Sequence, residues 1–511
     1  MVKIEAPVEA CGEQRARQKS TVELRENRLG SIVEFGGGCR ELAKNGKAGC
    51  LKHAARTFTQ SSVCQEMYAL LSLFAIQDAV TIVHGPRGCI SFAFGLNMFY
   101  RFGNVLRGNA PRNNRWLSSN LTEYETIHGG GDKLRSTILD ADKRLKPKVI
   151  FVLTSCVCGI IGDPVMDIVG KLQPQVNARL VPIQCEGFKS KVWVTGCDAA
   201  FHGIAEYLLK PTPKQADLVN VITPLTTGKL DEVEIARLFG EIGLRGNFIP
   251  SFATPEDLAQ STGAAATAAL CLAFGDYFAR HLTEKYGVPQ AQEIMPLGVR
   301  STDQWLCEIG KLTGKEKAVE ELIAREHKAI QPELAELRKV LKGKRVFISG
   351  GQARAVTLAA LGEDLGFEVV GITMFHYDEI VESNIKWLAK HFGNFKVQVA
   401  NMQQFEHVNL IKRLKPDLYV GEPATTATAA VLGIPSTAIF DLSFTCLGYR
   451  GIRFFGERMT RALKNPAFPK GLSRHARLPY RDAWYAQDPF KYLKEANEEN
   501  NKEVSRVGSN K

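Results

Sequence analysis

The chain carries cysteine in three similar settings: Ser62-Val63-Cys64, then His84-Gly85-Pro86-Arg87-Gly88-Cys89, and then Thr154-Ser155-Cys156-Val157-Cys158-Gly159. Cys89 and Cys156 each follow a strand-like apolar run. Parallel α/β sheets bind ligands at the carboxyl ends of their strands, and glycine there lets backbone N–H groups approach a sulfur-rich anion. The three thiols therefore suit an iron–sulfur cluster that a second chain completes. Because no Cys-x-x-Cys pair is present, spacing alone leaves open that they are ordinary buried thiols.

Length and composition indicate a globular protein of several domains. The chain has 511 residues, of which 45% are apolar and 23% charged, so roughly two to four domains are expected. The net charge of +11 suggests a nucleic-acid or membrane partner. The basic residues are diffuse or terminal, however, and no aromatic-rich basic motif accompanies them. We therefore expect no nucleic-acid partner, and an acidic partner protein fits the charge better.

The sequence shows no export or membrane segment. Residues 1–28 are charged throughout and lack the apolar core of a secretory signal. The longest apolar stretch, Tyr68–Val83, is interrupted by Gln77 and Asp78 and is too short to span a bilayer. In such a chain twelve cysteines predict free thiols and metal ligands rather than disulfides. We expect a cytoplasmic protein with no membrane contact.

Alternating strand and helix patterns predict an α/β protein with three Rossmann-like, doubly wound domains. We predict a loosely folded N-terminal arm, three α/β domains and a polar C-terminal tail, over residues 1–54, 55–215, 216–343, 344–460 and 461–511 respectively. In the second domain the pattern predicts one long helix over Ala264–Tyr286, stopped by Gly287-Val288-Pro289. In the third, Lys344-Arg345-Val346-Phe347-Ile348-Ser349-Gly350-Gly351 predicts a basic opening, a buried strand and a glycine turn, followed by a helix from Ala355.

Several separate motifs over roughly residues 55–465 resemble the nitrogenase component 1 superfamily. The three cysteine segments are similar to those that hold the P-cluster in its α-type, or D, subunits. Three further segments match as well: Gly129-Gly130-Gly131-Asp132-Lys133-Leu134, Cys185-Glu186-Gly187-Phe188, and Leu270-Cys271 leading to Glu284-Lys285-Tyr286-Gly287-Val288-Pro289. The second of these resembles the strand end that lines the active-site cavity, and the third resembles the helix whose cysteine binds the catalytic cofactor.

The resemblance implies two iron–sulfur groups. Cys64, Cys89 and Cys156 would hold a cluster at the interface with a sister K-type subunit, in an α2β2 heterotetramer. Three more cysteines from that subunit would make it a P-cluster, and one more would make it a four-iron cluster. Cys271 would hold one end of a large catalytic iron–sulfur cofactor. Its expected place near the start of a helix favours a thiolate.

The sequence departs from the family pattern at the positions that would bind the other parts of the catalytic cofactor. Where nitrogenases carry a glutamine and a histidine after the Cys-Glu-Gly-Phe motif, this chain has Trp193 and Cys197. The lysine that anchors homocitrate would fall near Ala424, and the histidine that binds the heterometal end would fall at Leu447, beside Cys446. The resemblance therefore implies a cofactor without homocitrate or molybdenum.

The remaining candidate groups for the cavity are Trp193, Phe188, Arg354 and His376. Arg354, on the turn after a third-domain strand, suits an electropositive cover for an anionic cluster, or is a surface arginine at a helix start. His376 is a candidate proton donor or the missing far-end ligand, or else a structural histidine. Cys446 is the other candidate for the far end, and Trp193 is either a cavity wall or an ordinary core aromatic.

Within the superfamily the pattern is most similar to the D subunits of methylthio-alkane reductases. That resemblance implies reductive C–S cleavage of small thioethers to methanethiol and a hydrocarbon, with electrons from an ATP-dependent iron protein. A cofactor-assembly scaffold also lacks the homocitrate and far-end ligands, so it remains an alternative. The α chain of an alternative nitrogenase is a further one.

Overall fold

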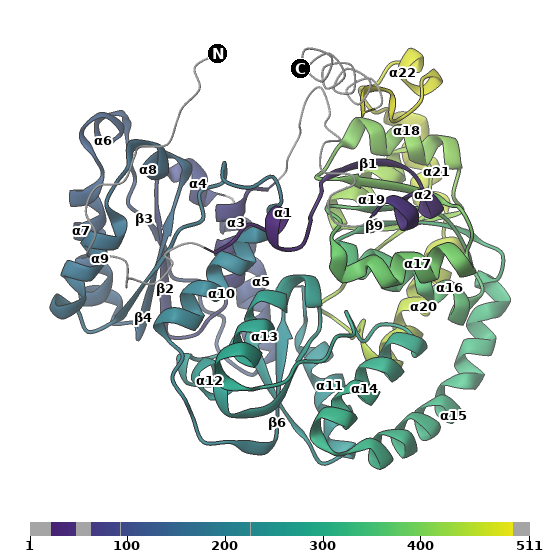
Figure 1. The fold of residues 1–511 in the computed structure, drawn as a ribbon. Coiled ribbons are helices and arrows are strands. Elements are labelled where there is room, and N and C mark those ends of the chain that lie inside the picture. Colours follow the sequence, from purple (N-terminus) through teal and green to yellow (C-terminus); the bar gives the residue numbers. More distant parts are fainter. Residues whose placement is uncertain (1–21, 47–62, 92, 225, 494–511) are drawn as a thin grey trace, which may run out of the picture.

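Residues 22–46, 63–91, 93–224 and 226–493 are described by the computed structural model (Figure 1). Most of the expected N-terminal arm and the end of the C-terminal tail lie outside these residues. Three sheets are built from residues 79–183, 215–269 and 345–438, and strand β1 joins the third of them. Within the described ranges, every helix is too short or too polar to traverse a bilayer.

The first sheet has the strand order β3-β2-β4-β5, and all its strands are parallel. Strands β2 and β4 are buried along their whole length, which is typical of parallel sheets covered by helices on both faces. The strands are β2 Ala79–His84, β3 Trp116–Ser118, β4 Val149–Thr154 and β5 Arg179–Ile183. The helices are α3 Gln65–Leu73, α4 Arg87–Ser91, α5 Ala93–Leu106, α6 Glu123–His128, α7 Gly131–Leu145, α8 Cys156–Ile161, α9 Val165–Leu172 and α10 Thr195–Tyr207.

The second sheet is smaller, with the parallel order β7-β6-β8. Its strands are β6 Gln215–Thr223, β7 Arg245–Pro250 and β8 Ala264–Ala269. The helices that follow are α11 Lys229–Glu241, α12 Pro255–Gln260, α13 Leu272–Tyr286, α14 Val299–Thr313 and α15 Glu316–Leu341. In Figure 1 the long helix α15 runs along the outer edge of the molecule toward the third sheet.

The expected helix over Ala264–Tyr286 is wrong in its first part. Residues 264–269 form strand β8, which pairs with β6, and the helix begins only at Leu272. Alanine favours a helix, but here its small side chain fits a buried strand, so tertiary packing decides the conformation. The predicted stop is confirmed, because Gly287 ends α13 in the left-handed conformation with φ 63°.

The third sheet has the order β1-β11-β10-β9-β12-β13. Its strands are β1 Glu34–Gly38, β9 Arg345–Gly350, β10 Glu368–Met374, β11 Lys396–Ala400, β12 Leu418–Gly421 and β13 Ser436–Ala438. Helices around it are α2 Cys39–Asn45, α16 Gln352–Leu365, α17 Glu382–His391, α18 Gln404–Leu414, α19 Pro423–Val431, α20 Gly448–Lys464, α21 Ala467–His475 and α22 Asp482–Ala486.

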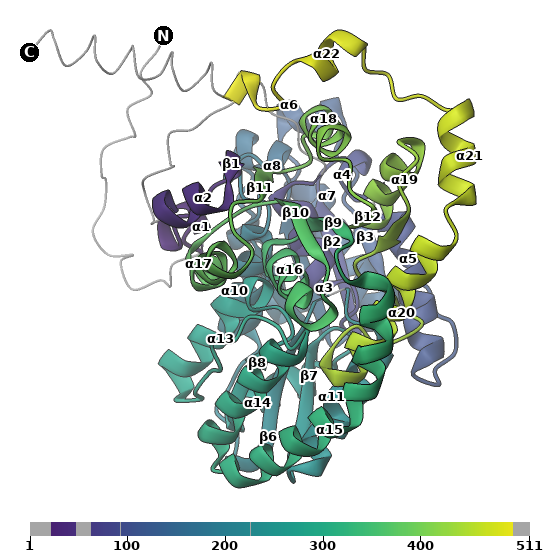
Figure 2. The same cartoon turned by 90° about the vertical axis from the view of Figure 1, so that its right-hand side faces the viewer.

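Two boundaries in this unit differ from the predicted ones. Helix α16 begins three residues before the predicted Ala355, and α20 runs through residue 461, where the C-terminal tail was expected to begin. Figure 2 shows α21 and α22 on the outside of this unit.

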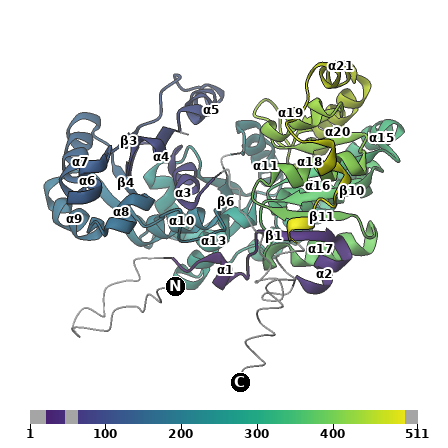
Figure 3. The ribbon, with the colours of Figure 1, turned by 90° about the horizontal axis from the view of Figure 1, so that it is seen from above.

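The N-terminal segment is part of the fold rather than a loose arm, where the structure describes it. Strand β1 pairs antiparallel with β11, and helix α1 (Arg25–Arg28) lies between the first and third units (Figures 1 and 3). Arg25 is fully buried: it donates to Asp198 on α10 at 2.7 and 2.8 Å and lies 3.6 Å from Asp378 after β10. Arg28 pairs with Asp198 and with Asp276 on α13. Two arginines therefore join residues of all three units.

Candidate functional site

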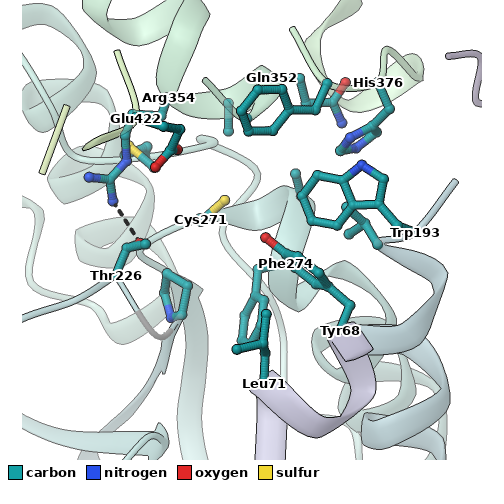
Figure 4. A pocket seen from close by; sticks show the side chains of 17 residues that line it. Tyr68, Leu71, Trp193, Thr226, Cys271, Phe274, Gln352, Arg354, His376 and Glu422 are labelled. Carbon is teal, nitrogen blue, oxygen red and sulfur yellow. Dashed lines mark hydrogen bonds between the residues drawn. The ribbon is translucent and has the colours of Figure 1, made fainter. Parts of the chain in front are cut away.

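A cavity lies where the three units meet (Figure 4). Its walls come from α3, from the segment before α10, from the turn after β6, from the start of α13, and from the turns after β9, β10 and β12. Three of these turns follow the carboxyl ends of neighbouring parallel strands, where open α/β sheets bind their ligands. Four predicted residues line it: Cys271, Trp193, Arg354 and His376.

Cys271 is the N-cap residue of α13, and the N–H groups of Phe274 and Gly275 donate to its carbonyl. Figure 4 shows its sulfur pointing into the cavity. Burial raises the pKa of the thiol, while Arg354 and the N–H groups of the first helical turn act in the opposite direction. The N–H groups at the helix start favour the thiolate, as expected, but the effect of burial is larger and favours the neutral thiol. A bound metal would release that proton.

Aromatic rings form the wall opposite Arg354. The rings of Tyr68 and Trp193 lie 3.8 Å apart between centroids, and Trp193 meets His376 edge-on at 6.0 Å. Trp193 Nε1 and both ring nitrogens of His376 are buried without a hydrogen-bond partner in the described part of the chain. Burial, reinforced by Arg25, lowers the pKa of His376 to about 3, so the imidazole is neutral at physiological pH.

Arg354 is fixed at the third-domain wall. Its guanidinium donates to the Ile439 carbonyl at 3.1 Å and to Thr226 Oγ1 at 3.2 Å. It lies over the Phe440 ring, 5.8 Å from the centroid. Arg354 is therefore a largely buried cation at the cavity, and it is not the surface arginine that the sequence allowed as an alternative.

Two of the considered residues lie away from the cavity. Phe188 is 56% exposed and is not among the lining residues. Cys446 is buried, does not line the cavity, and donates its backbone N–H to Asp231 at 2.8 Å. Conversely, Tyr68 and Glu422 line the cavity although sequence reasoning did not select them.

The second candidate site is formed by Cys64, Cys89 and Cys156. Cys64 is the N-cap residue of α3, Cys156 opens α8, Cys89 lies in α4, and all three are half-buried. A Cβ atom built on Gly187 would lie 3.2 Å from Cys64 Sγ and 3.4 Å from Cys156 Sγ. The two thiols thus converge on a backbone position that has no side chain. Burial raises the pKa of Cys89 to about 12 and also raises that of Cys64.

Across the described residues, no three His, Cys, Asp or Glu side chains converge on a point that would hold a single metal ion. Cys158 and Cys185, the other thiols near this site, are buried and engaged with backbone. Cys158 Sγ accepts from the Ser155 N–H at 3.1 Å and contacts the His84 carbonyl, while Cys185 Sγ contacts the Thr154 carbonyl. Both sulfurs are therefore in contact with backbone groups of their own unit.

We expect Gly187→Ala to disrupt the site of the three half-buried cysteines. The new methyl group would lie 2.9 Å from Cys64 Cβ and close to both thiols, which is too near for a close-packed site to accept unchanged. The iron content and cluster spectrum of the purified complex should fall relative to wild type. Gly170→Ala, on α9 and outside the three cysteine segments, is the matched control, since a Cβ there meets nothing within 4 Å. Equal iron in both variants would contradict the placement of a cluster at Gly187.

Comparison with known proteins decides the family. Residues 64–464 match the family model described as nitrogenase component 1 type oxidoreductase. The chain belongs to the nitrogenase component 1 family. The match includes all three half-buried cysteines and Cys271, so the family resemblance of the sequence is confirmed.

Relatives of this nitrogenase component 1 chain include two kinds of protein. It is 26% identical over 425 residues to the nitrogenase iron-molybdenum cofactor biosynthesis protein NifE of Methanococcus maripaludis, covering 82% of this chain and 86% of the relative. It is 25% identical over 413 residues to the nitrogenase molybdenum-iron protein alpha chain of Methanothermobacter thermautotrophicus, covering 77% and 86%. The solved structure of nitrogenase Cp1 at pH 6.5 is 19% identical, with a TM-score of 0.68 over 84% of this chain and 93% of that chain. The predicted fold of three Rossmann-like domains is thereby confirmed.

The residues of the cavity fit an iron–sulfur group of the kind that this family binds. Cys271 offers a soft thiol ligand for iron. Arg354 offers a fixed positive charge opposite it. Trp193 and His376 hold buried ring nitrogens without a hydrogen-bond partner among the described residues, although Asp378 lies 3.6 Å from His376 Nε2. Such atoms are costly unless a bound group supplies the hydrogen bond. No lysine is among the described residues that line the cavity, in agreement with the absence of a lysine near Ala424.

Proposed function

We propose that this chain is the catalytic D-type subunit of a nitrogenase-like reductase that cleaves the C–S bond of small thioethers, as methylthio-alkane reductases do. The lining of the cavity carries the proposal. One thiol and one guanidinium face a wall of aromatic and aliphatic side chains, including Tyr68, Leu71 and Phe274. Such a wall suits a small uncharged substrate. The bound iron–sulfur cofactor would supply the electrons for the chemistry, and the chain would supply position and access.

A sister K-type subunit is proposed to cover the three half-buried cysteines and complete their cluster, as a P-cluster or a four-iron cluster, in an α2β2 assembly. Large apolar side chains are exposed around them: Ile160 on α8 is 74% exposed, Phe188 follows Gly187, and Phe94 and Met98 lie one turn apart on α5. Exposed apolar groups gathered in this way mark protein interfaces. An ATP-dependent iron protein would dock over the same cluster and deliver electrons.

The test is turnover of a thioether. The purified complex with its iron protein and ATP, given ethyl methyl sulfide, should release methanethiol and ethane, and omission of ATP should abolish the release. Gas chromatography of the headspace measures both products. Absence of methanethiol, with iron and subunits present in full, would refute the proposed reaction.

A cofactor-assembly scaffold is the second candidate, and the similarity to NifE proteins favours it. A scaffold would release its cofactor to an apo-enzyme and would not turn over thioethers. Incubating the purified complex with a cofactor-free reductase, followed by an activity assay of the acceptor, separates the two functions. The α chain of an alternative nitrogenase is distinguished by vanadium in the metal analysis and by rapid reduction of acetylene and dinitrogen.

A further inference from the structure

Glu422 places a carboxyl group in the cavity. Neither the family match nor the interface cluster explains why it is there. It lies between β12 and α19, at the N-cap position, where it precedes Pro423. Its backbone carbonyl accepts from the N–H groups of Thr425 and Thr426, but its side chain makes no capping hydrogen bond. The carboxyl is therefore not used to hold the helix start, and it faces the cavity beside Arg354 (Figure 4).

The surroundings leave this carboxyl without a partner in the part of the chain that the structure describes. Arg354 is the cation that acts on its pKa, but the hydrogen bonds of that guanidinium go to Ile439 and Thr226. Burial raises the pKa values of Tyr68 and Tyr419, on α3 and β12, and the negative charge of Glu422 adds to this effect. Burial, partly offset by Arg354, raises the pKa of Glu422 to about 7, against about 4.3 for an ordinary glutamate.

The other titratable groups that line the cavity are poor proton donors. The pKa of His376 is lowered to about 3, so the imidazole is neutral at physiological pH and its remaining N–H is a very weak acid. The pKa of the Tyr68 hydroxyl is raised well above its usual value by burial. The Cys271 thiol is the expected iron ligand. Among the described lining residues, Glu422 is the group whose pKa is raised to about 7.

The proposed reaction needs such a donor. Reductive cleavage of a methyl thioether takes up two electrons and two protons: the C–S bond breaks, a C–H bond forms on the alkyl group, and an S–H bond forms on methanethiol. The electrons come from the low-potential iron–sulfur protein of the proposed function. We infer that the Glu422 carboxyl is the acid that protonates the departing thiolate sulfur. A thiol of the cysteine type has a pKa of about 8.5, so proton transfer from Glu422 to a thiolate is downhill.

This inference rests on the proposed function and is tested with the complete complex. Glu422→Gln should slow methanethiol release about 100-fold, since general acids contribute at least that factor, while Glu422→Asp should retain part of the rate. The wild-type rate should fall as pH rises through about 7, because the protonated form is the active one, and Glu422→Gln should lose this dependence. Glu363→Gln, an exposed glutamate on α16, is the control and should match wild type.

A second readout does not depend on turnover. Infrared difference spectra of the purified complex should show the carbonyl band of a protonated carboxylic acid that disappears near pH 7 in wild type and is absent from Glu422→Gln. Iron content should be equal in the two proteins. A wild-type rate in Glu422→Gln, a carboxylate ionised throughout this range, or loss of iron in the variant would each overturn the assignment. Absence of methanethiol from the wild-type complex would instead refute the proposed function itself.

Discussion

Cys271→Ala should remove the iron that belongs to the cavity while leaving the iron at Cys64, Cys89 and Cys156 in place. Cys271 is the one thiol among the described residues that line the cavity, and alanine offers iron no ligand. Purified complexes of variant and wild type are compared by iron per heterotetramer and by low-temperature electron paramagnetic resonance. The signal of the interface cluster should persist, and the signal of the cavity cofactor should be lost together with all methanethiol release.

Two other cysteine variants make this result specific. Cys307→Ala, in a half-buried position on α14, should keep all iron. Cys446→Ala should keep it too, because that thiol is buried away from the cavity lining. Loss of cofactor iron from Cys446→Ala would show that Cys446 holds the far end of the cofactor. Full iron in Cys271→Ala would refute the cofactor site.

The strands that position the interface cysteines could be predicted because a continuous apolar run in the sequence marks each of them. Val149–Leu153 is a continuous apolar run between polar segments, and it forms β4 with Cys156 just beyond its end. Burial on both faces requires apolar side chains at every position, so such a strand can be recognised without its neighbours. The same holds for β2, which leads to Cys89.

The β8 strand and the N-terminal segment depend on distant partners and were missed. Ala264–Ala269 forms a strand because β6 lies beside it, over 40 residues earlier in the chain. Strand β1 pairs with β11, more than 350 residues away. Neither the secondary-structure propensity of the residues nor the charge pattern indicates contacts between residues so far apart in the sequence. A polar, glycine-rich stretch such as residues 34–38 therefore looks like a loose arm until the partner strand is known.

The cavity was predicted in part, through residues that carry recognisable chemistry. Cys271, Trp193, Arg354 and His376 line the cavity, whereas Phe188 and Cys446 do not. The roles assigned to all of them stay predictions. Glu422 was missed because its segment was considered only for an absent lysine. Its position directly after a buried strand was the available signal, since ligand sites gather at the carboxyl ends of strands.

Arg25→Met should destabilise the folded chain by about 3–5 kcal/mol, the usual cost of breaking a buried ion pair by removing one partner. Arg25 is fully buried between Asp198 and Asp378. Asp198 keeps Arg28 as a partner. Asp378 would lose its arginine and keep hydrogen bonds from Gln352, Ser31 and the Ile380 N–H, with His376 Nε2 at 3.6 Å. Urea unfolding followed by tryptophan fluorescence measures the loss. Arg40→Ala, an exposed arginine on α2, is the control and should change stability by no more than about 0.5 kcal/mol.

The loss of stability caused by Arg25→Met should depend on pH, and the direction of that dependence tests whether Asp378 is the group that Arg25 neutralises. Burial raises the pKa of Asp378, and Arg25 is the strongest influence that lowers it, so the variant should have a still higher folded-state pKa. A carboxyl whose pKa is raised on folding opposes folding increasingly as pH rises from its unfolded pKa, about 3.9, to its folded pKa. The deficit of Arg25→Met should therefore be smaller at about pH 5 than at about pH 8, and Asp378→Asn in the same chain should remove most of this difference. A deficit independent of pH would show that Asp378 is not the group that Arg25 neutralises.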